Sequence, residues 1–289
     1  MSTPPRGDVF LKLETLQPTF SYKIRGAFNA LLKLSEHRDN RARIVTASAG
    51  NHGRAMAYAA ATLGLPLTVY APETAPRTKL DAIRRTGATL RTCADYDDAE
   101  RCAKEHAATH GDVFISPYSH PDVIAGAGTV GLEILDDDLG IDSIVVPVGG
   151  GGLISGIALA AAAASRRAVR VIGVEVAASN PFTRSLAAGR IVEIDVQPTL
   201  ADGLAGNLNP ETITFDLVRR LVSRIVTVDE DALRRAVRGL VIEERLVTEG
   251  AAAVGVAALL SGALEVEGAR TALVISGGNI DAEKLKALL

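Results

Sequence analysis

Residues 143–153 read Ser-Ile-Val-Val-Pro-Val-Gly-Gly-Gly-Gly-Leu, and this stretch decides the fold. Its first half is a short apolar run, typical of a strand buried on both faces of a parallel sheet. The four glycines lead directly into the apolar stretch Leu153–Ala164, which we predict to be a helix. A strand, a glycine turn and a helix in this order indicate an α/β protein.

The glycine turn itself predicts a ligand. Four glycines let the backbone approach a bound group without a Cβ in the way, and N–H groups at a helix N-terminus attract an anion. A tight turn alone needs only one glycine. We therefore expect Gly149–Gly152 to bind a phosphate group. The chain has no GxxxxGK[ST] motif, and the dinucleotide fingerprint fails because Ser155 replaces its third glycine.

The same alternation of strand and helix continues along the chain. The predicted strands are Val9–Leu13, Arg43–Ala47, Leu67–Ala71, Thr89–Thr92, Val113–Ile115, Ser143–Val148, Val169–Glu175, Ile225–Val228 and Thr271–Ser276. The predicted helices include His52–Leu63, Ala94–Thr109, Leu153–Ala164, Glu230–Glu244 and Ala251–Leu260. This spacing predicts mainly parallel sheets. One long irregular stretch, Ile191–Pro210, interrupts the pattern.

The composition excludes several classes of protein. Of 289 residues, 47% are hydrophobic and 22% are charged, which excludes intrinsic disorder. The net charge is −3 and no basic cluster occurs, so we expect no nucleic-acid partner. No apolar run reaches the length of a membrane span and no signal peptide is evident, so we expect a cytoplasmic protein without membrane contact. The two cysteines, Cys93 and Cys102, are expected to be structural.

Two further glycine-containing loops also follow predicted strands. Ser48-Ala-Gly-Asn-His-Gly53 comes after one strand and Ser276-Gly-Gly-Asn279 ends the last. Ligands of parallel α/β sheets bind outside the carboxyl ends of the strands, so these loops are candidates for one site. Lys23 is one of only seven lysines and lies in a loop before the predicted helix Ala27–Leu34. A lysine amine and a phosphate site together are what pyridoxal phosphate (PLP) requires.

On these motifs the chain resembles the fold type II PLP enzymes, and within them the threonine/serine dehydratase and serine racemase group. The match runs from residue 8 to residue 282 and includes Ser21-Tyr-Lys-Ile-Arg-Gly-Ala27. The resemblance implies a tryptophan-synthase-β-like architecture of two three-layer α/β domains with mainly parallel, twisted sheets. We expect residues 1–42 plus 122–289 to form a large cofactor-binding domain, and residues 43–121 a small domain with the substrate loop.

The resemblance also implies roles for individual residues. Lys23 would carry the cofactor covalently and would later take the Cα proton of the substrate. The implied cofactor-binding residues are Tyr22, Lys23, Asn51, Gly149, Gly150, Gly151, Gly152, Leu153 and Ser276. The implied substrate-binding loop consists of Ser48, Ala49, Gly50, Asn51 and His52.

The activity that the resemblance implies is α,β-elimination from L-threonine, L-serine or a related 3-hydroxy amino acid, giving a 2-oxo acid and ammonia in a homodimer. A racemase is the first alternative, but Ala49 stands where racemases of the group carry a proton-donating serine. A β-replacement transferase of the cysteine-synthase type is the second. The third is a non-catalytic or nicotinamide-binding protein.

Some positions depart from the family pattern. The divalent-metal site of relatives uses an acid at the position of Glu175 and an Asp six residues on, where this chain has Pro181. We therefore expect no metal there, with Glu175 the only candidate ligand.

The segment before the first strand is short and the chain ends soon after Asn279, so no C-terminal regulatory domain is expected. Glu249 has two interpretations of equal weight. It resembles an active-site glutamate of the family, and it is also an acidic residue at the start of a predicted helix, where such residues are common. His106 and His110 are expected on a solvated helix face.

Overall fold

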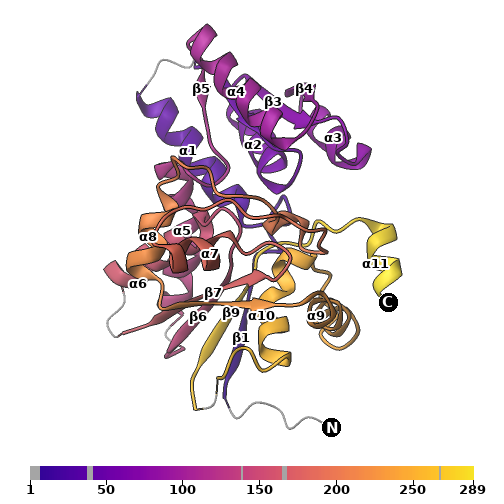
Figure 1. Ribbon diagram of the computed structural model, residues 1–289. Helices are drawn as coiled ribbons and strands as arrows, with labels where there is room; N and C mark the ends of the chain where they lie inside the picture. Colours follow the sequence, from indigo (N-terminus) through magenta and orange to yellow (C-terminus); the bar gives the residue numbers. More distant parts are fainter. Residues whose placement is uncertain (1–6, 38–41, 138, 165–167, 267) are drawn as a thin grey trace. The chain divides into compact units, whose positions relative to one another are not determined.

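The computed structural model describes residues 7–37, 42–137, 139–164, 168–266 and 268–289. The chain divides into two compact units. Met1–Leu16 and Ala127–Leu289 form the large unit, and Gln17–Gly126 forms the small unit. Each unit is built around its own sheet, and every strand pairing in both sheets is parallel (Figure 1). The predicted α/β fold with mainly parallel sheets is confirmed.

The sheet of the large unit has the order β1-β9-β6-β7-β8. Its strands are β1 (Val9–Leu13), β6 (Ser143–Pro147), β7 (Arg170–Val176), β8 (Arg224–Val228) and β9 (Thr271–Ile275). Its helices are α6 (Gly152–Ala164), α7 (Pro181–Ala188), α8 (Thr214–Leu221), α9 (Glu230–Ile242), α10 (Gly250–Leu260) and α11 (Ala282–Leu288), with the short 3₁₀ helix η1 (Asp202–Leu204). The helix α5 (Pro121–Asp136) contains the boundary between the units.

Burial on both faces explains the apolar strands of the large unit. All five residues of β6 and all five of β9 are buried. The small side chains of α10 pack against β6, β7, β8 and β9, while α6 contacts β6 and β7. Both helices are apolar on nearly every side, as expected of helices inside a core. Within the described residues, no helix is both long enough and apolar enough to cross a bilayer.

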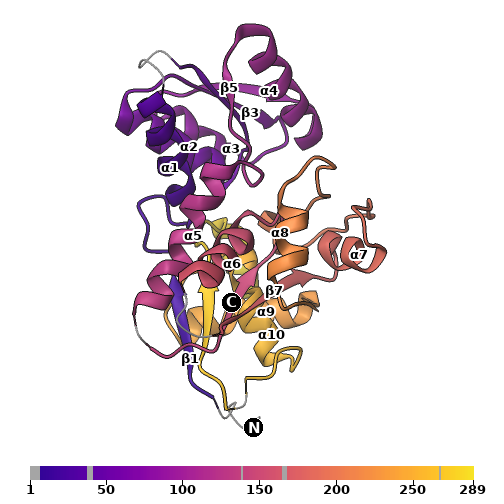
Figure 2. The same ribbon diagram turned by 90° about the vertical axis from the view of Figure 1, so that its left-hand side faces the viewer.

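The sheet of the small unit has the order β4-β3-β2-β5. Its strands are β2 (Ile44–Ala47), β3 (Leu67–Pro72), β4 (Thr89–Cys93) and β5 (Val113–Phe114), and its helices are α1 (Lys23–His37), α2 (Asn51–Leu63), α3 (Arg77–Arg84) and α4 (Tyr96–His110). Successive strand residues enter different cores: Ile44 packs with α1 and α2, whereas Val45 packs with α4. The helices α1 and α2 lie side by side (Figure 2).

The structure differs from the sequence analysis in two places. The first helix begins at Lys23 rather than Ala27, so the lysine lies on a helix end and not in a loop. Residues 17–42 and 122–126, which we placed with the large domain, group with the small unit. The reason is the packing of α1, whose Ala27 and Leu31 share a core with Ala55 and Met56 of α2.

Candidate active site

The small unit carries the first set of predicted site residues beyond the carboxyl ends of β2 and β5. Lys23 is the first residue of α1, and its Nζ donates a hydrogen bond to Pro117 O at 2.6 Å. Pro117 belongs to the loop that follows β5. The ring of Tyr22 lies 5.2 Å from Lys23 Nζ. The side-chain amine of Lys23 is therefore held by backbone of a neighbouring strand loop, at the end of the sheet where α/β ligands bind.

The predicted substrate loop joins β2 to α2. Ser48 N donates to Tyr70 O at 2.9 Å, and Gly50 N donates to Ser48 Oγ at 3.2 Å. The residue that caps α2 is Gly50, which provides no side-chain cap, and Asn51 is already helical. The first turn of α2 has no acidic residue. The N–H groups of this turn therefore lack a side-chain acceptor from the cap position, an arrangement that suits a carboxylate ligand.

Gly53 shows why this loop needs its second glycine. A Cβ at this position would lie only 2.0 Å from Ser48 O. The first turn of α2 therefore packs directly on the backbone of the loop that precedes it.

His52 is a buried histidine with a defined tautomer. Its Nε2 lies 3.0 Å from Thr46 Oγ1, and Thr46 donates its own hydroxyl hydrogen to Ile115 O at 2.7 Å. Thr46 must therefore accept from Nε2–H, which leaves Nδ1 unprotonated. Nδ1 has no hydrogen-bond partner among the described residues. Burial, and next the positive charge of Lys23, lower the pKa of His52 well below its ordinary value, so the ring is neutral at pH 7.

The large unit carries the second set, beginning with the glycine turn between β6 and α6. Gly151 has φ of +83°, and a Cβ there would lie 2.6 Å from Phe182 Cζ. Thr214 Oγ1 donates to Gly150 O at 2.8 Å and fixes the orientation of that peptide. Ser155 N donates to Gly151 O at 3.0 Å, so the helical hydrogen bonds start within the turn.

Ser276 belongs to the same unit and follows the last residue of β9. It is 4% exposed. The backbone next to it is fixed on both sides, because Glu14 N donates to Ile275 O at 3.0 Å and Glu249 N donates to Gly277 O at 3.1 Å. Glu249 itself is the residue before α10, in the N-cap position. Its contact with the Ser276 loop is made by its backbone.

Within each unit, the residues fit the expected PLP cofactor. The first turn of α6 contains no acidic residue, and its glycines place no side chain between the backbone N–H groups and a phosphate. Ser155 Oγ, in that first turn, is buried and has no hydrogen-bond partner among the described residues. The neutral hydroxyl of Ser276 can pair with a ring nitrogen, and the amine of Lys23 provides the one group that must bond covalently.

Glu175, the candidate ligand at the position of the family's metal site, caps the start of a helix. Its two carboxylate oxygens accept from Phe182 N at 2.8 Å, Thr183 N at 2.9 Å and Thr183 Oγ1 at 2.6 Å, at the start of α7. Burial raises the pKa of Glu175, although these three hydrogen bonds act in the opposite direction. Both carboxylate oxygens of Glu175 therefore hold the start of α7.

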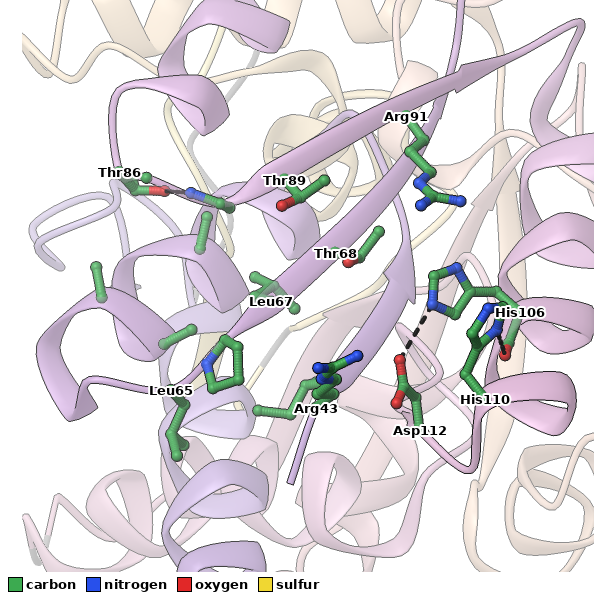
Figure 3. Close-up of a pocket in the computed structure, with 17 residues that line it drawn as sticks. Arg43, Leu65, Leu67, Thr68, Thr86, Thr89, Arg91, His106, His110 and Asp112 are labelled. Carbon is green, nitrogen blue, oxygen red and sulfur yellow. Dashed lines mark hydrogen bonds and ion pairs between the residues drawn. The ribbon is translucent and has the colours of Figure 1, made fainter. Parts of the chain in front are cut away.

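A cavity of about 490 Å³ lies at the other end of the small unit's sheet, beside the amino ends of its strands (Figure 3). His106 lines this cavity. We predicted a solvated side chain for His106, but it is only 10% exposed. Its Nε2 lies 3.1 Å from Asp112 Oδ2 and its Nδ1 lies 2.8 Å from Tyr70 Oη. His110 is exposed, as predicted. Three helices end here, so their negative dipole ends offset the basic side chains.

Comparison with known proteins gives the family. The family model described as "Pyridoxal-phosphate dependent enzyme" matches residues 1–277. An L-threonine ammonia-lyase of Thermotoga maritima is 42% identical over 98% of this chain and 70% of that protein. The catabolic L-threonine dehydratase TdcB of Escherichia coli K12 is 40% identical over 98% of this chain and 86% of that protein. The structure of maize serine racemase superposes with a TM-score of 0.89 at 33% identity, covering 97% of this chain and 86% of that one. The chain belongs to the family of pyridoxal-phosphate dependent enzymes.

Proposed function

We propose that this enzyme is an ammonia-lyase that eliminates water from L-threonine, L-serine or a related 3-hydroxy amino acid, releasing a 2-oxo acid and ammonia. The observation that carries the proposal is its identity of 42% and 40% to an L-threonine ammonia-lyase and an L-threonine dehydratase, each over 98% of the chain. PLP, when bound, withdraws electrons from the substrate and so makes its Cα–H acidic.

Lys23 is proposed as the residue that carries the cofactor and then acts as the base at Cα. Its position supports this role, because an amine at the first residue of α1 is fixed by the helix backbone and by Pro117 O. A base must lie within hydrogen-bond reach of the proton that it takes, and a fixed side chain meets that condition better than a solvated one.

The remaining cofactor contacts are proposed from the two sets of residues. The N–H groups of Gly149–Gly152 and Leu153 would bind the phosphate, Tyr22 would lie beside the ring, and Asn51 would hydrogen-bond its O3′. Ser276 would pair with the ring nitrogen. A serine hydroxyl is a weak acid and does not keep that nitrogen protonated as a carboxylate would, so a charge on Cα is stabilised less. This condition favours prompt loss of the β-hydroxyl group.

The loop from Ser48 to His52 is proposed to bind the substrate carboxylate. Gly50 N already donates to Ser48 Oγ, which leaves the hydroxyl hydrogen of Ser48 available to the substrate. The uncapped start of α2 adds backbone donors. His52, neutral in this position, contributes no charge and fixes the loop through Thr46.

Racemisation is the principal alternative, since serine racemase is among the structural relatives. Ala49 is 1% exposed, and its methyl group packs with Ala71, Ala75 and Leu80. This side chain has no group that could donate a proton to Cα. The position supports elimination over racemisation.

A substrate panel tests the proposal. Purified holoenzyme is incubated with L-threonine, L-serine and their D-enantiomers, and 2-oxo acid, ammonia and amino-acid chirality are measured. We expect equal amounts of 2-oxo acid and ammonia from an L-substrate, with no D-product. Accumulation of D-serine without 2-oxo acid would establish the racemase instead. A new thioether or thiol product on addition of sulfide would establish the β-replacement transferase.

We also propose that the enzyme is a cytoplasmic homodimer, a state supported by its family resemblance. Light scattering of the holoenzyme at micromolar concentration tests the oligomeric state. A monomer mass would contradict the proposal.

A further inference from the structure

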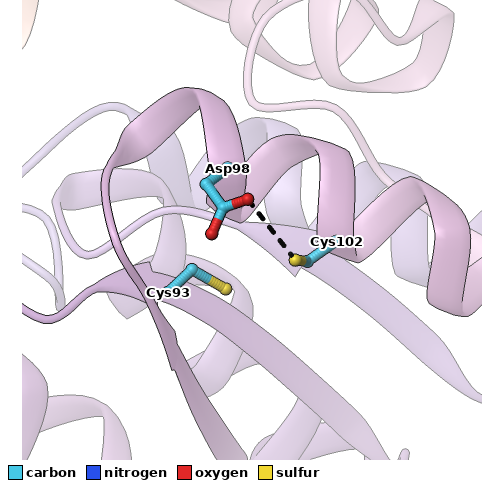
Figure 4. Close-up of side chains that lie close together, drawn as sticks. All are labelled: Cys93, Asp98 and Cys102. Atoms are coloured by element: carbon cyan, nitrogen blue, oxygen red, sulfur yellow. Dashed lines mark hydrogen bonds between the residues drawn. The ribbon is translucent and has the colours of Figure 1, made fainter.

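The fold brings both cysteines of the chain together with one carboxylate. Cys93 is the last residue of β4, whereas Asp98 and Cys102 lie one turn apart on α4. The ligand atoms of these three residues all lie within 4.8 Å of one another. Their side chains point toward a common centre between strand and helix (Figure 4). We propose that Cys93, Asp98 and Cys102 form a binding site for Zn²⁺, separate from the catalytic residues.

The distances are close to those of a tetrahedral zinc site. Zn–S bonds of about 2.3 Å and Zn–O bonds of about 2.0–2.2 Å place two sulfur ligands about 3.8 Å apart, and sulfur and oxygen about 3.5 Å apart. Cys102 Sγ and Asp98 Oδ1 are 4.0 Å apart. Since all three ligand atoms lie within 4.8 Å of one another, no pair needs to close by more than about 1.3 Å. Two sulfur ligands favour Zn²⁺ over Mg²⁺ or Ca²⁺, which prefer oxygen.

The charges around the site also balance. Two thiolates and one carboxylate carry three negative charges, of which Zn²⁺ neutralises two. Arg101 supplies the remaining positive charge, because its Nη2 forms an ion pair with Asp98 and lies 3.8 Å from Cys102 Sγ. The side chain of Asp98 is 29% exposed, so solvent provides an entry path and a water as the fourth ligand.

The position of the site indicates its effect. Among the described strands, β4 lies at the edge of its sheet and pairs with β3 alone. A metal held by Cys93 and by α4 would tie that edge to the helix that covers it. We therefore expect Zn²⁺ to raise the thermal stability of the enzyme, since a ligand that binds only the folded state stabilises it. Turnover should not depend on this metal.

Cobalt is the direct probe. Reduced, chelator-treated holoenzyme is titrated with Co²⁺ and followed by its visible d–d bands and by thiolate-to-cobalt charge transfer, and Zn²⁺ is then added to displace it. We expect one Co²⁺ to bind per chain and to give both the d–d bands and the thiolate-to-cobalt charge-transfer band. Cys93→Ser, Cys102→Ser and Asp98→Asn should each weaken binding by at least about tenfold, because loss even of a group that only supports a ligand costs about 10–100-fold. Asp97→Asn is the matched control, a neighbouring acid on the same turn outside the cluster, and should bind as the wild type does.

A measurement on the wild-type enzyme keeps the test independent of folding defects. Zn²⁺ should protect both thiols from a disulfide-type thiol reagent, and a chelator should restore their reactivity. Cobalt bound without a thiolate band, or equal thiol reactivity with and without Zn²⁺, would overturn the proposal. Variants are compared only if they keep the wild-type circular dichroism and cofactor absorbance.

Discussion

The two ends of the parallel sheets differ in what they offer a ligand. At the amino ends lie the cavities, of about 490 Å³ beside Arg91 and His106 in the small unit, and about 370 Å³ beside Arg170 and Arg224 in the large unit. At the carboxyl ends lie Lys23, the Ser48–His52 loop, the glycine turn and Ser276. These two cavities lie at the amino ends, whereas the carboxyl ends have a fixed amine, uncapped helix starts and buried hydroxyl groups.

The proposed catalytic residues line neither of these two cavities. In βα units the helices start at the carboxyl ends of the strands and finish at the amino ends. Their positive dipole ends therefore favour anions such as phosphate and carboxylate on one side only. The direction of the strands is therefore our reason for proposing the active site at the carboxyl ends.

The strongest test of this comparison is Lys23→Ala at a carboxyl end. We expect kcat/KM for the preferred amino acid to fall by at least about 10³-fold, since a positioned base alone contributes about 10²–10⁴-fold and covalent attachment of the cofactor is lost as well. Absorbance after borohydride reduction and denaturation should show no cofactor attached to the chain.

Lys33→Ala is the matched control, because Lys33 lies on the same helix with an exposed side chain paired to Asp122. It should retain wild-type activity and covalent cofactor. If Lys23→Ala kept wild-type turnover, the assignment of the catalytic end of the sheet would be wrong.

The carboxyl-end residues could be proposed from the sequence because their signals are local. The four glycines Gly149–Gly152 predict a turn without side chains. The structure explains the need for glycine at Gly151, which has a φ of +83° and lies too close to the ring of Phe182 to carry a Cβ. The strands were predicted for the same reason, since an apolar run between turn residues is contained in a few neighbouring residues.

Contacts between residues that are far apart in the sequence leave no such local pattern. Pro117 holds Lys23 through a backbone carbonyl, which any residue could supply, and Thr214 reaches Gly150 from 64 positions away. The boundary between the two units could not be predicted from neighbouring residues either, because it depends on the packing of α1 against α2. Pairing of Cys93 with Cys102 depends likewise on how β4 and α4 pack.

Gly151→Ala tests the large unit's carboxyl end. The substitution forces a left-handed φ on an alanine at a cost of about 1–2 kcal/mol. It also drives a methyl group into Phe182, at a further cost of about 1–3 kcal/mol. We expect the Kd for PLP, measured by fluorescence titration of apoenzyme, to rise at least about tenfold.

Gly189→Ala separates these two costs. Gly189 has a similar φ of +70°, and its Cβ would meet no atom within 4 Å. It should lose stability through φ alone and bind PLP as the wild type does. Equal PLP affinity in both variants would contradict a phosphate site at the glycine turn.

His52 gives the carboxyl end of the small unit a characteristic pH dependence. Its pKa is lowered in the folded state, so below the unfolded pKa of about 6.5 the unfolded chain binds the additional proton. The unfolding free energy should therefore be unaffected by His52 above that pH and fall by up to about 1.4 kcal/mol per pH unit below it.

Urea unfolding of the enzyme between pH 5 and pH 8 measures this slope. His52→Gln should flatten it relative to the wild type, whereas the control His110→Gln, at an exposed histidine of α4, should not. An unchanged slope in His52→Gln would show that the buried ring is not the group that takes up the proton.

Arg91→Ala tests the amino end, where the smallest effect is expected. Arg91 is exposed, donates to Tyr70 Oη at 3.1 Å and lines the larger cavity. A surface substitution of this kind changes stability by about 0.5 kcal/mol or less. Because Arg91 is not among the proposed catalytic or binding residues, we expect kcat/KM to stay within about twofold of the wild-type value. A steady-state assay on the amino acid that the panel identifies measures it. A loss of activity comparable with that of Lys23→Ala would place function at the amino ends.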